Sequence, residues 1–306
     1  PPEAASAVPR TMHTNPVPRR LDQLAAEGGL APPRQALLAA TLAAGLPTAR
    51  DENWRYANLR GLDRQVFSAA RRATGEGLQR ITDALPAAVE GHARLVVVDG
   101  WLCEALCAGP LPAGVAVIDG DAAARAVPAT PPSPTPATPL RAPYQDGDAL
   151  PVDQRFAGLN LALAAQALRI DLPRGTEAAV EVLFVATADG ARAASHPSLQ
   201  VRVGEAARLR LVERHLGVDG LATFSNADIR IEVGRGATLR HLRLQALGSR
   251  ARHFETLSLR AHDAADCEVI TIAAGALSAR STALVELAGR DAALRWYATA
   301  LGNRTQ

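Results

Sequence analysis

The sequence predicts a mainly β protein, in which a right-handed β-helix (a β-solenoid) follows a smaller N-terminal region of helices and α/β structure. One turn sequence recurs four times, starting at Gly204, Gly234, His262 and Gly289, so the repeats are 27 to 30 residues long. Apolar residues alternate with a period of two in each unit, which is typical of strands with one buried face. A repeat of this length cannot bury its inner face alone, and stacked repeats share a continuous core.

The repeat also predicts which side chains stack. Each turn carries Ala at its third or fourth position, and a second apolar strand follows it. In-register coils predict one interior column, made of Leu209, Leu239, Cys267 and Leu294. Before the fourth turn, the alternation through Val285 and Leu287 is slipped by one residue, which predicts a bulge or a register change. An antiparallel sandwich is the alternative, but its turns would not need to repeat one sequence.

Composition divides the chain into four parts. Residues 1–18, with five Pro, are expected to be a disordered leader, and residues 128–150 a Pro-rich linker. Between them, residues 19–127 are expected to form a helical or α+β region, with helices ending at Gly28 and Gly45 and strands at 95–98 and 115–118. Residues 151–306 are the expected β-helix core, which opens with an amphipathic helix over 153–167 and a strand from Arg169. The C-terminal end of this core is expected to be truncated, because the fourth clear coil has no polar cap.

Charge and cysteine content exclude several classes of protein. The 33 basic and 31 acidic residues leave a net charge of +2, which is too small to indicate nucleic acid as a partner. Every basic residue is Arg, so there is no Lys to form a Schiff base or to hold a P-loop phosphate. Three Cys are too few for a disulfide scaffold, which favours a reducing compartment. No run of 18 apolar residues and no signal peptide is visible, so we expect a cytoplasmic protein that does not bind membranes.

The Cys and His residues show no metal-binding pattern. Cys103 and Cys107 are spaced as two ligands on one helical turn would be, but no second pair matches them. Two small apolar side chains near a strand end are the favoured interpretation. Cys267 takes a Leu position of the repeat and is predicted to be an inert core residue. Five histidines share no repeat position, so each is expected to be a solvated or hydrogen-bonded turn residue: His196, His215, His241, His253 and His262.

No catalytic constellation is visible either. The chain has no Gly-rich phosphate loop and no nucleophile elbow. A β-solenoid that cleaves polysaccharide would present carboxylates on adjacent coils. The comparable positions carry Glu213, Arg243, Thr271 and Ala298, which make no carboxylate cluster. We therefore assign no catalytic and no metal-binding residue, leave cofactor-binding residues unknown, and expect a scaffold or an assembly subunit rather than an enzyme.

Several segments resemble one known family. Residues 47–59, which include Glu52, Trp54, Arg55 and Tyr56, resemble the E-x-W-[KR]-Y/F-T signature near the start of SufB/SufD iron–sulfur cluster assembly proteins. Residues 98–115 look like the strand and LP-x-GV segment of the SufD branch, and residues 159–162 are similar to its LN-x-A helix. The markers of its β-helix are similar to His196-Pro197, Glu213, Asn226, residues 275–280 (GALSAR) and residues 287–289. The order of these motifs, from about residue 20 to the end, is typical of the SufD type.

This resemblance implies a non-catalytic subunit of the SUF machinery. It implies pairing with a SufB-type subunit through the β-helix edge, and docking of a SufC-type ABC ATPase. An iron–sulfur cluster would form transiently in that complex, with no cluster bound stably by this chain alone. The His and the ATPase-docking domain of the family lie beyond the position equivalent to Gln306, so no site residue is carried over. Whether this chain binds flavin or iron, and which surface meets SufB, stay open.

Two other functions are compatible with a β-solenoid. The alternative is a polysaccharide hydrolase or lyase, against which the missing carboxylate cluster and the missing signal peptide both weigh. A passive adhesion or structural solenoid would predict export, and the sequence shows no export signal. The scaffold subunit is therefore the favoured interpretation.

Overall fold

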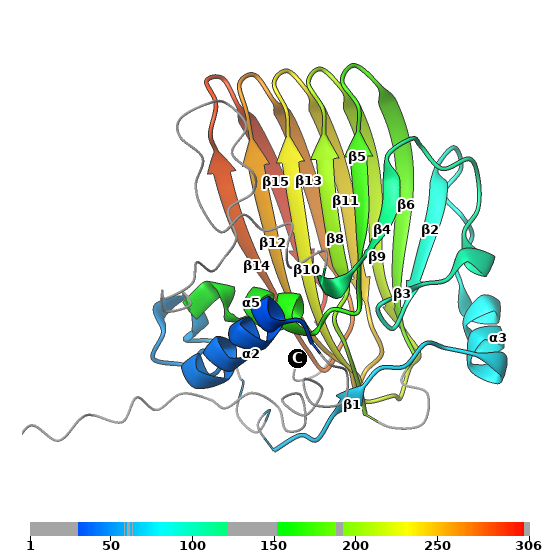
Figure 1. Cartoon of the computed structure of the whole chain (residues 1–306), viewed down its shortest axis with the longest axis vertical. Helices are drawn as coiled ribbons and strands as arrows, with labels where there is room; N and C mark the ends of the chain where they lie inside the picture. The colour runs from blue at the N-terminus through cyan, green and yellow to red at the C-terminus, as the bar shows by residue number, and fades with distance from the viewer. Residues whose placement is uncertain are drawn as a thin grey trace, which may run out of the picture.

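The computed structural model describes residues 30–57, 59, 62, 64–121, 152–187 and 192–302, and these form a two-sheet β-solenoid with helices on its outside (Figure 1). The predicted mainly β fold is confirmed. The expected leader at 1–18, the helix ending at Gly28 and the linker at 128–150 lie outside the described residues. Within the described residues, no helix is both long enough and apolar enough to cross a membrane.

Each coil of the solenoid is a pair of strands that a tight turn connects. The first strand of each pair lies in one sheet and the second in the other, and successive coils pair in parallel. The pairs are β5 (Gln166–Leu172) with β6 (Glu177–Ala186), β8 (Ser198–Val203) with β9 (Arg208–Gly217), β10 (Phe224–Val233) with β11 (Thr238–Ala246), β12 (Arg252–Ala261) with β13 (Asp266–Ala273), and β14 (Ser278–Leu287) with β15 (Ala293–Ala300). A short strand, β7 (Ala193–Ser195), precedes β8.

The N-terminal elements extend and cover both sheets. β2 (Ala93–Val98) pairs in parallel with β6, and β4 (Val115–Asp119) pairs antiparallel with β5. The strands predicted at 95–98 and 115–118 are therefore present, and each adds to a solenoid sheet. The remaining elements are α2 (Pro32–Ala44), η1 (Glu52–Trp54), β1 (Ser68–Ala69), α3 (Gly75–Ala84), β3 (Trp101–Leu102), η2 (Glu104–Leu106) and η3 (Val152–Gln154).

The helix expected over 153–167 is shorter and differently packed. It is α5 (Arg155–Leu163), and every residue from Phe156 to Leu163 is buried, so the helix is apolar all round rather than amphipathic. α5 packs against α2 on one side and against β10 on the other, which explains why no face is left for water. Ala167 belongs instead to β5, opposite Ile118 of β4.

The predicted interior column is confirmed. Strand register pairs Leu209 with Leu239, Leu239 with Cys267, and Cys267 with Leu294. The first three are at most 1% exposed and belong to one apolar core. The Ala of each turn is also buried in the first three copies, at Ala207, Ala237 and Ala265. Small corner side chains let the coils stack at the parallel-strand spacing of about 4.8 Å.

The slip predicted before the fourth turn is wrong. β12 and β14 pair without interruption, and Leu259 faces Val285 while Ala261 faces Leu287. The extra residue is taken up in the turn, because Leu287 to Leu294 spans seven positions whereas Ala261 to Cys267 spans six. The backbone N–H groups of Ala288 and Gly289 both donate to the carbonyl of Ala261, which holds the longer turn against the preceding coil.

Candidate functional site

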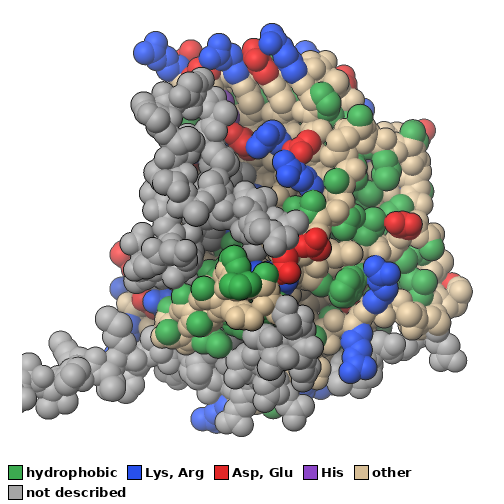
Figure 2. Space-filling model, in the orientation of Figure 1, with side chains coloured by type: hydrophobic (Ala, Val, Ile, Leu, Met, Phe, Trp, Pro, Cys, Tyr) green, Lys and Arg blue, Asp and Glu red, His purple; other side chains and the backbone are tan. Residues whose placement is uncertain are grey.

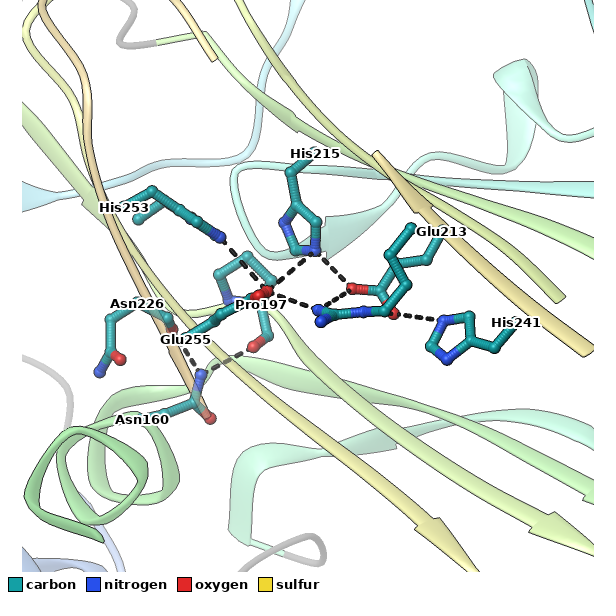
Figure 3. A network of polar contacts seen from close by, with 10 residues as sticks. Asn160, Pro197, Glu213, His215, Asn226, His241, His253 and Glu255 are labelled. Atoms are coloured by element: carbon teal, nitrogen blue, oxygen red, sulfur yellow. Dashed lines mark hydrogen bonds and ion pairs between the residues drawn. The ribbon is translucent and has the colours of Figure 1, made fainter. Parts of the chain in front are cut away.

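Polar side chains fill the half of the solenoid lumen that lies away from the turns between the paired strands. On β9 and β11, the alternation that points Leu209 and Leu239 into the lumen continues to Glu213, His215, His241 and Arg243. The facing strand β12 adds His253 and Glu255 (Figure 3). We call these six residues the lumen cluster. All of them are buried.

Arg243 connects the two sheets through the centre of the lumen cluster. Its Nη2 atom donates to Glu213 Oε1 at 3.0 Å and to Glu255 Oε2 at 2.6 Å. Glu213 lies beside Arg243 in the same sheet, whereas Glu255 reaches it from the opposite sheet. A buried guanidinium thus compensates two buried carboxylates, which would otherwise be costly to remove from water.

Three histidines complete the lumen cluster. His215 Nε2 and His241 Nε2 lie 2.6 and 2.9 Å from the two carboxylate oxygens of Glu213. His253 Nε2 lies 3.4 Å from Glu255 Oε2. The expectation of solvated or turn histidines is therefore wrong for these three, which are buried on strands. They share no column, as predicted, but facing sheets bring them together.

The other two histidines have different surroundings. His262 lies in a turn, is half-buried, and contacts Glu232 at 2.9 Å, so the prediction of a hydrogen-bonded turn residue is confirmed for it. His196, between β7 and β8, is buried instead. Burial, with a smaller contribution from the charge of Arg34, lowers the pKa of His196 from 6.5 to about 3.

The electrostatics of the lumen cluster favour two carboxylates and one guanidinium. Burial alone would raise the pKa of Glu213, but Arg243 and the two imidazoles outweigh it and hold that pKa well below its ordinary value. The pKa of Glu255 is lowered in the same way, mainly by Arg243. Burial lowers the pKa values of His241 and His253, and the neighbouring carboxylates offset only part of this effect. The two carboxylates and the guanidinium together carry a net charge of −1.

Two asparagines from the SufD-like motifs have structural roles. Asn160 Nδ2, on α5, donates to the carbonyls of Pro197 and Asn226 at 2.7 and 2.6 Å (Figure 3). Asn226 Nδ2 donates in return to the carbonyl of Phe156 at 2.8 Å. These bonds hold α5 against β10. Trp54 of the first motif stacks on Phe156 from the other side, with ring centroids 5.5 Å apart.

The cysteines behave as apolar residues. Cys103 packs against the cluster around Val96 and Val98, whereas Cys107 packs against the solenoid core, so the two thiols serve different apolar clusters. Cys107 Sγ donates to the carbonyl of Cys103 at 3.4 Å. Cys267 is fully buried, and burial raises its pKa to about 11. All three are free thiols, and the apolar interpretation fits their packing.

The four positions that were compared for a carboxylate cluster do form one column of the solenoid. Glu213, Arg243, Thr271 and Ala298 are register partners on successive strands, and only the first is acidic. Glu255 is not part of this column, because it lies on β12 in the facing sheet. Both glutamates are buried and bound to Arg243, so neither presents an open carboxylate to a polymer. This geometry does not match the solvent-accessible acid pair of a glycoside hydrolase.

Most coils of the solenoid match the model of one known protein family. Residues 184–306 match the family model described as "SUF system FeS cluster assembly, SufBD core domain". The match runs from the end of β6 through the last described strand, so it covers most coils of the solenoid.

A curated relative narrows the class. The chain is 26% identical over 272 residues to "Iron-sulfur cluster assembly protein SufD" from Escherichia coli (strain K12). The alignment covers 86% of this chain and 57% of the relative, so the chain spans little more than half the length of that relative. Together the two matches support a SufD-type protein, which confirms the resemblance seen in the motifs.

Proposed function

We propose that this chain is a scaffold subunit in iron–sulfur cluster assembly of the SUF type. The observation that carries the proposal is the SufBD core match over the solenoid coils, joined by the similarity to SufD across most of the chain. The chain contributes a rigid, in-register solenoid on which other subunits assemble. It does not itself transform a substrate.

The proposed partners are a SufB-type subunit and a SufC-type ABC ATPase. β14 and β15 are the last strands of their sheets, and their outer edges have no strand partner among the described residues. Val285, Leu287 and Tyr297 expose apolar surface beside these edges. An unpaired edge with apolar neighbours is the kind of surface on which another β-helix adds its strands. We assign the SufB-type contact to this edge.

The arrangement of polar groups supports a role without catalysis. A general acid or base must reach a substrate proton within hydrogen-bond distance. Glu213 and Glu255 are buried, and both are engaged by Arg243. The lumen cluster therefore supports the fold rather than a reaction on a large substrate.

We propose that the iron–sulfur cluster is cargo of the assembled complex and not a resident group of this chain. Iron–sulfur clusters are usually held by four thiolates, and this chain has three Cys. Cys267 is in the core, and Cys103 and Cys107 pack into separate apolar clusters. Binding a cluster through all three thiols would require the core around Cys267 to open, so we propose that the cluster ligands come from outside residues 1–306.

Co-expression with the SufB-type subunit and the ABC ATPase of the same genome tests the proposal. We expect this chain and the SufB-type subunit to form one complex by gel filtration, and we expect V285K/L287K to weaken it at the β14 edge. Leu242→Lys is a control for a lysine at an exposed apolar position, because Leu242 is also partly exposed but lies on the outer face of the central strand β11. Equal weakening by both variants would contradict the assigned edge.

Anaerobic reconstitution tests the cargo assignment. We expect iron and sulfide to remain with the complex and to separate from the isolated chain on gel filtration. A stoichiometric cluster on the isolated chain, lost in Cys267→Ser, would overturn the scaffold proposal. Turnover of polysaccharide by the isolated chain would support the hydrolase or lyase alternative instead.

A further inference from the structure

Three metal-ligating groups meet inside the solenoid. One ring nitrogen each from His215 and His253 and one carboxylate oxygen from Glu255 lie within 4.8 Å of one another, and all three residues are buried. β9 supplies the first and β12 the other two, so facing sheets build the set. We propose that the lumen binds one divalent transition-metal ion, of the class of Zn²⁺, through these three residues. This proposal is independent of the proposed assembly function.

Two of the three distances between ligand atoms are close to those around a small divalent ion. Glu255 Oε2 lies 3.4 Å from His253 Nε2 and 3.8 Å from His215 Nε2. With metal–ligand bonds of about 2.0–2.2 Å, the ligand atoms of a tetrahedral site lie roughly 3.3–3.6 Å apart. Two imidazoles and one carboxylate are also a donor set that Zn²⁺ and related first-row ions take, with a fourth position left for water.

The surroundings orient the proposed ligands. His253 Nδ1 lies 3.2 Å from Ser225 Oγ. In the tautomer whose Nδ1–H donates to this oxygen, the Nε2 lone pair points toward Glu255 Oε2, which is the orientation that a metal ion requires. A second hydrogen bond from the other ring nitrogen is characteristic of histidines that hold metals.

Gln245 is a buried side chain without a hydrogen-bond partner among the described residues, and it lies next to the proposed site. Gln245 is 6% exposed, and neither its Oε1 nor its Nε2 has a hydrogen-bond partner among the described residues. Register places Gln245 next to His215, with both side chains on the lumen side. Buried polar groups are ordinarily paired, so this amide needs a partner that protein atoms do not supply. Water on the fourth position of a bound ion would meet it.

The charges also leave room for a cation. Glu213 and Glu255 both bind the single guanidinium of Arg243, so two buried carboxylates share one cationic side chain in the lumen cluster. On binding, the proton of His215 Nε2 moves to Nδ1, which frees the Nε2 lone pair for the metal. Glu213 keeps Arg243 and His241 as its partners.

Titration of the tag-free, metal-free chain with Co²⁺ and Zn²⁺ tests the proposal. We expect one Co²⁺ per chain, with visible d–d bands and no thiolate charge transfer, and competition by Zn²⁺. His253→Gln and Glu255→Gln should each lower the affinity more than about tenfold. His262→Gln is the matched control, because His262 also contacts a glutamate but lies in a turn away from the lumen. Its affinity should equal that of the unchanged chain.

A second measurement avoids any variant that fails to fold. In the unchanged chain labelled with ¹⁵N at histidine, Zn²⁺ should shift the ring resonances of His215 and His253 and leave those of His262 in place. Shifts confined to His262, or no binding by the unchanged chain, would overturn the proposal. Equal affinities of the unchanged chain and Glu255→Gln would also overturn it.

Discussion

The two halves of the lumen lie on the same strands but differ in how their side chains vary from one coil to the next. Near the turns, Leu209, Leu239 and Cys267 repeat one kind of side chain along a column. Farther along β9 and β11, another inward column holds Glu213 and Arg243, which differ in charge. In-register stacking brings equivalent residues within about 4.8 Å, so apolar repetition builds a core, whereas repetition of one charge is destabilising. The polar half must therefore vary from coil to coil and pair across the lumen.

The largest effect is expected in the apolar half, where Leu239→Asp would test the column most severely. An unpaired carboxylate would replace a stacked side chain that is fully buried between Leu209 and Cys267. We expect a loss of about 5 kcal/mol or more in the free energy of unfolding, enough to unfold many domains. Urea titration by circular dichroism measures it. Leu239→Met conserves volume and should cost less than about 1.5 kcal/mol.

In the polar half, Arg243→Met should cost about 4 kcal/mol, because Glu213 and Glu255 would keep their charges without the guanidinium. The triple variant E213Q/R243M/E255Q removes all three charges and should recover most of this loss. No recovery would mean that Arg243 acts through packing alone, and that the cross-lumen pairing is not what stabilises this half.

The same ion pairs make the free energy of unfolding depend on pH. The pKa values of Glu213 and Glu255 are lowered in the folded state, so their stabilisation is present above the ordinary value of 4.5 and is lost as the pH falls below it. The penalty of Arg243→Met should accordingly shrink in acid, where the two carboxylates take up protons. A penalty that is constant from pH 7 to pH 4 would contradict this account.

His196 is a buried histidine outside the lumen cluster, and the charge of Arg34 adds to the effect of burial on its pKa instead of offsetting it. Its pKa of about 3 lies below the ordinary 6.5, so the unfolded chain takes up a proton below pH 6.5 and the folded chain does not. Stability is therefore lost as the pH falls from 6.5 toward 3. Between pH 7 and pH 5, the unchanged protein should lose about 2 kcal/mol more than His196→Asn. Equal slopes in the two proteins would show that His196 titrates normally.

The apolar half could be predicted from the sequence because its signal is repetition. The recurring turn fixes the strand ends, and the period-two alternation fixes which side faces inward, so Leu209, Leu239, Cys267 and Leu294 follow directly. The extra residue near Gly289 led to the wrong prediction of a slipped strand, because a longer turn and a slipped strand give the same spacing when residues are counted from the turn.

The lumen cluster could not be predicted in the same way. Its contacts join Glu213 and Arg243 to Glu255 across facing sheets, and a comparison of repeats reads only along one sheet. One local signal was present. In β11 the inward positions become polar at His241 and Arg243, while the outward Leu242 is 40% exposed. Such an inversion of polarity within a strand indicates a polar interior, although it does not identify the partner from the other sheet.

The smallest effect is expected where neither half of the lumen is involved. Arg235 lies in an exposed turn, where Figure 2 shows charged side chains gathered along the edge of the solenoid. Its Nη2 atom is 3.6 Å from Asp263 Oδ2, and both side chains are largely in solvent. Exposed pairs of this kind contribute little, so Arg235→Ala should change the free energy of unfolding by about 0.5 kcal/mol or less. Urea titration beside Leu239→Asp is the measurement, and equal losses in the two variants would mean that the register of the coils is wrong. If the small loss of stability in Arg235→Ala disappears at high salt, it comes from the exposed charges of the turn. The main source of stability would then be the lumen.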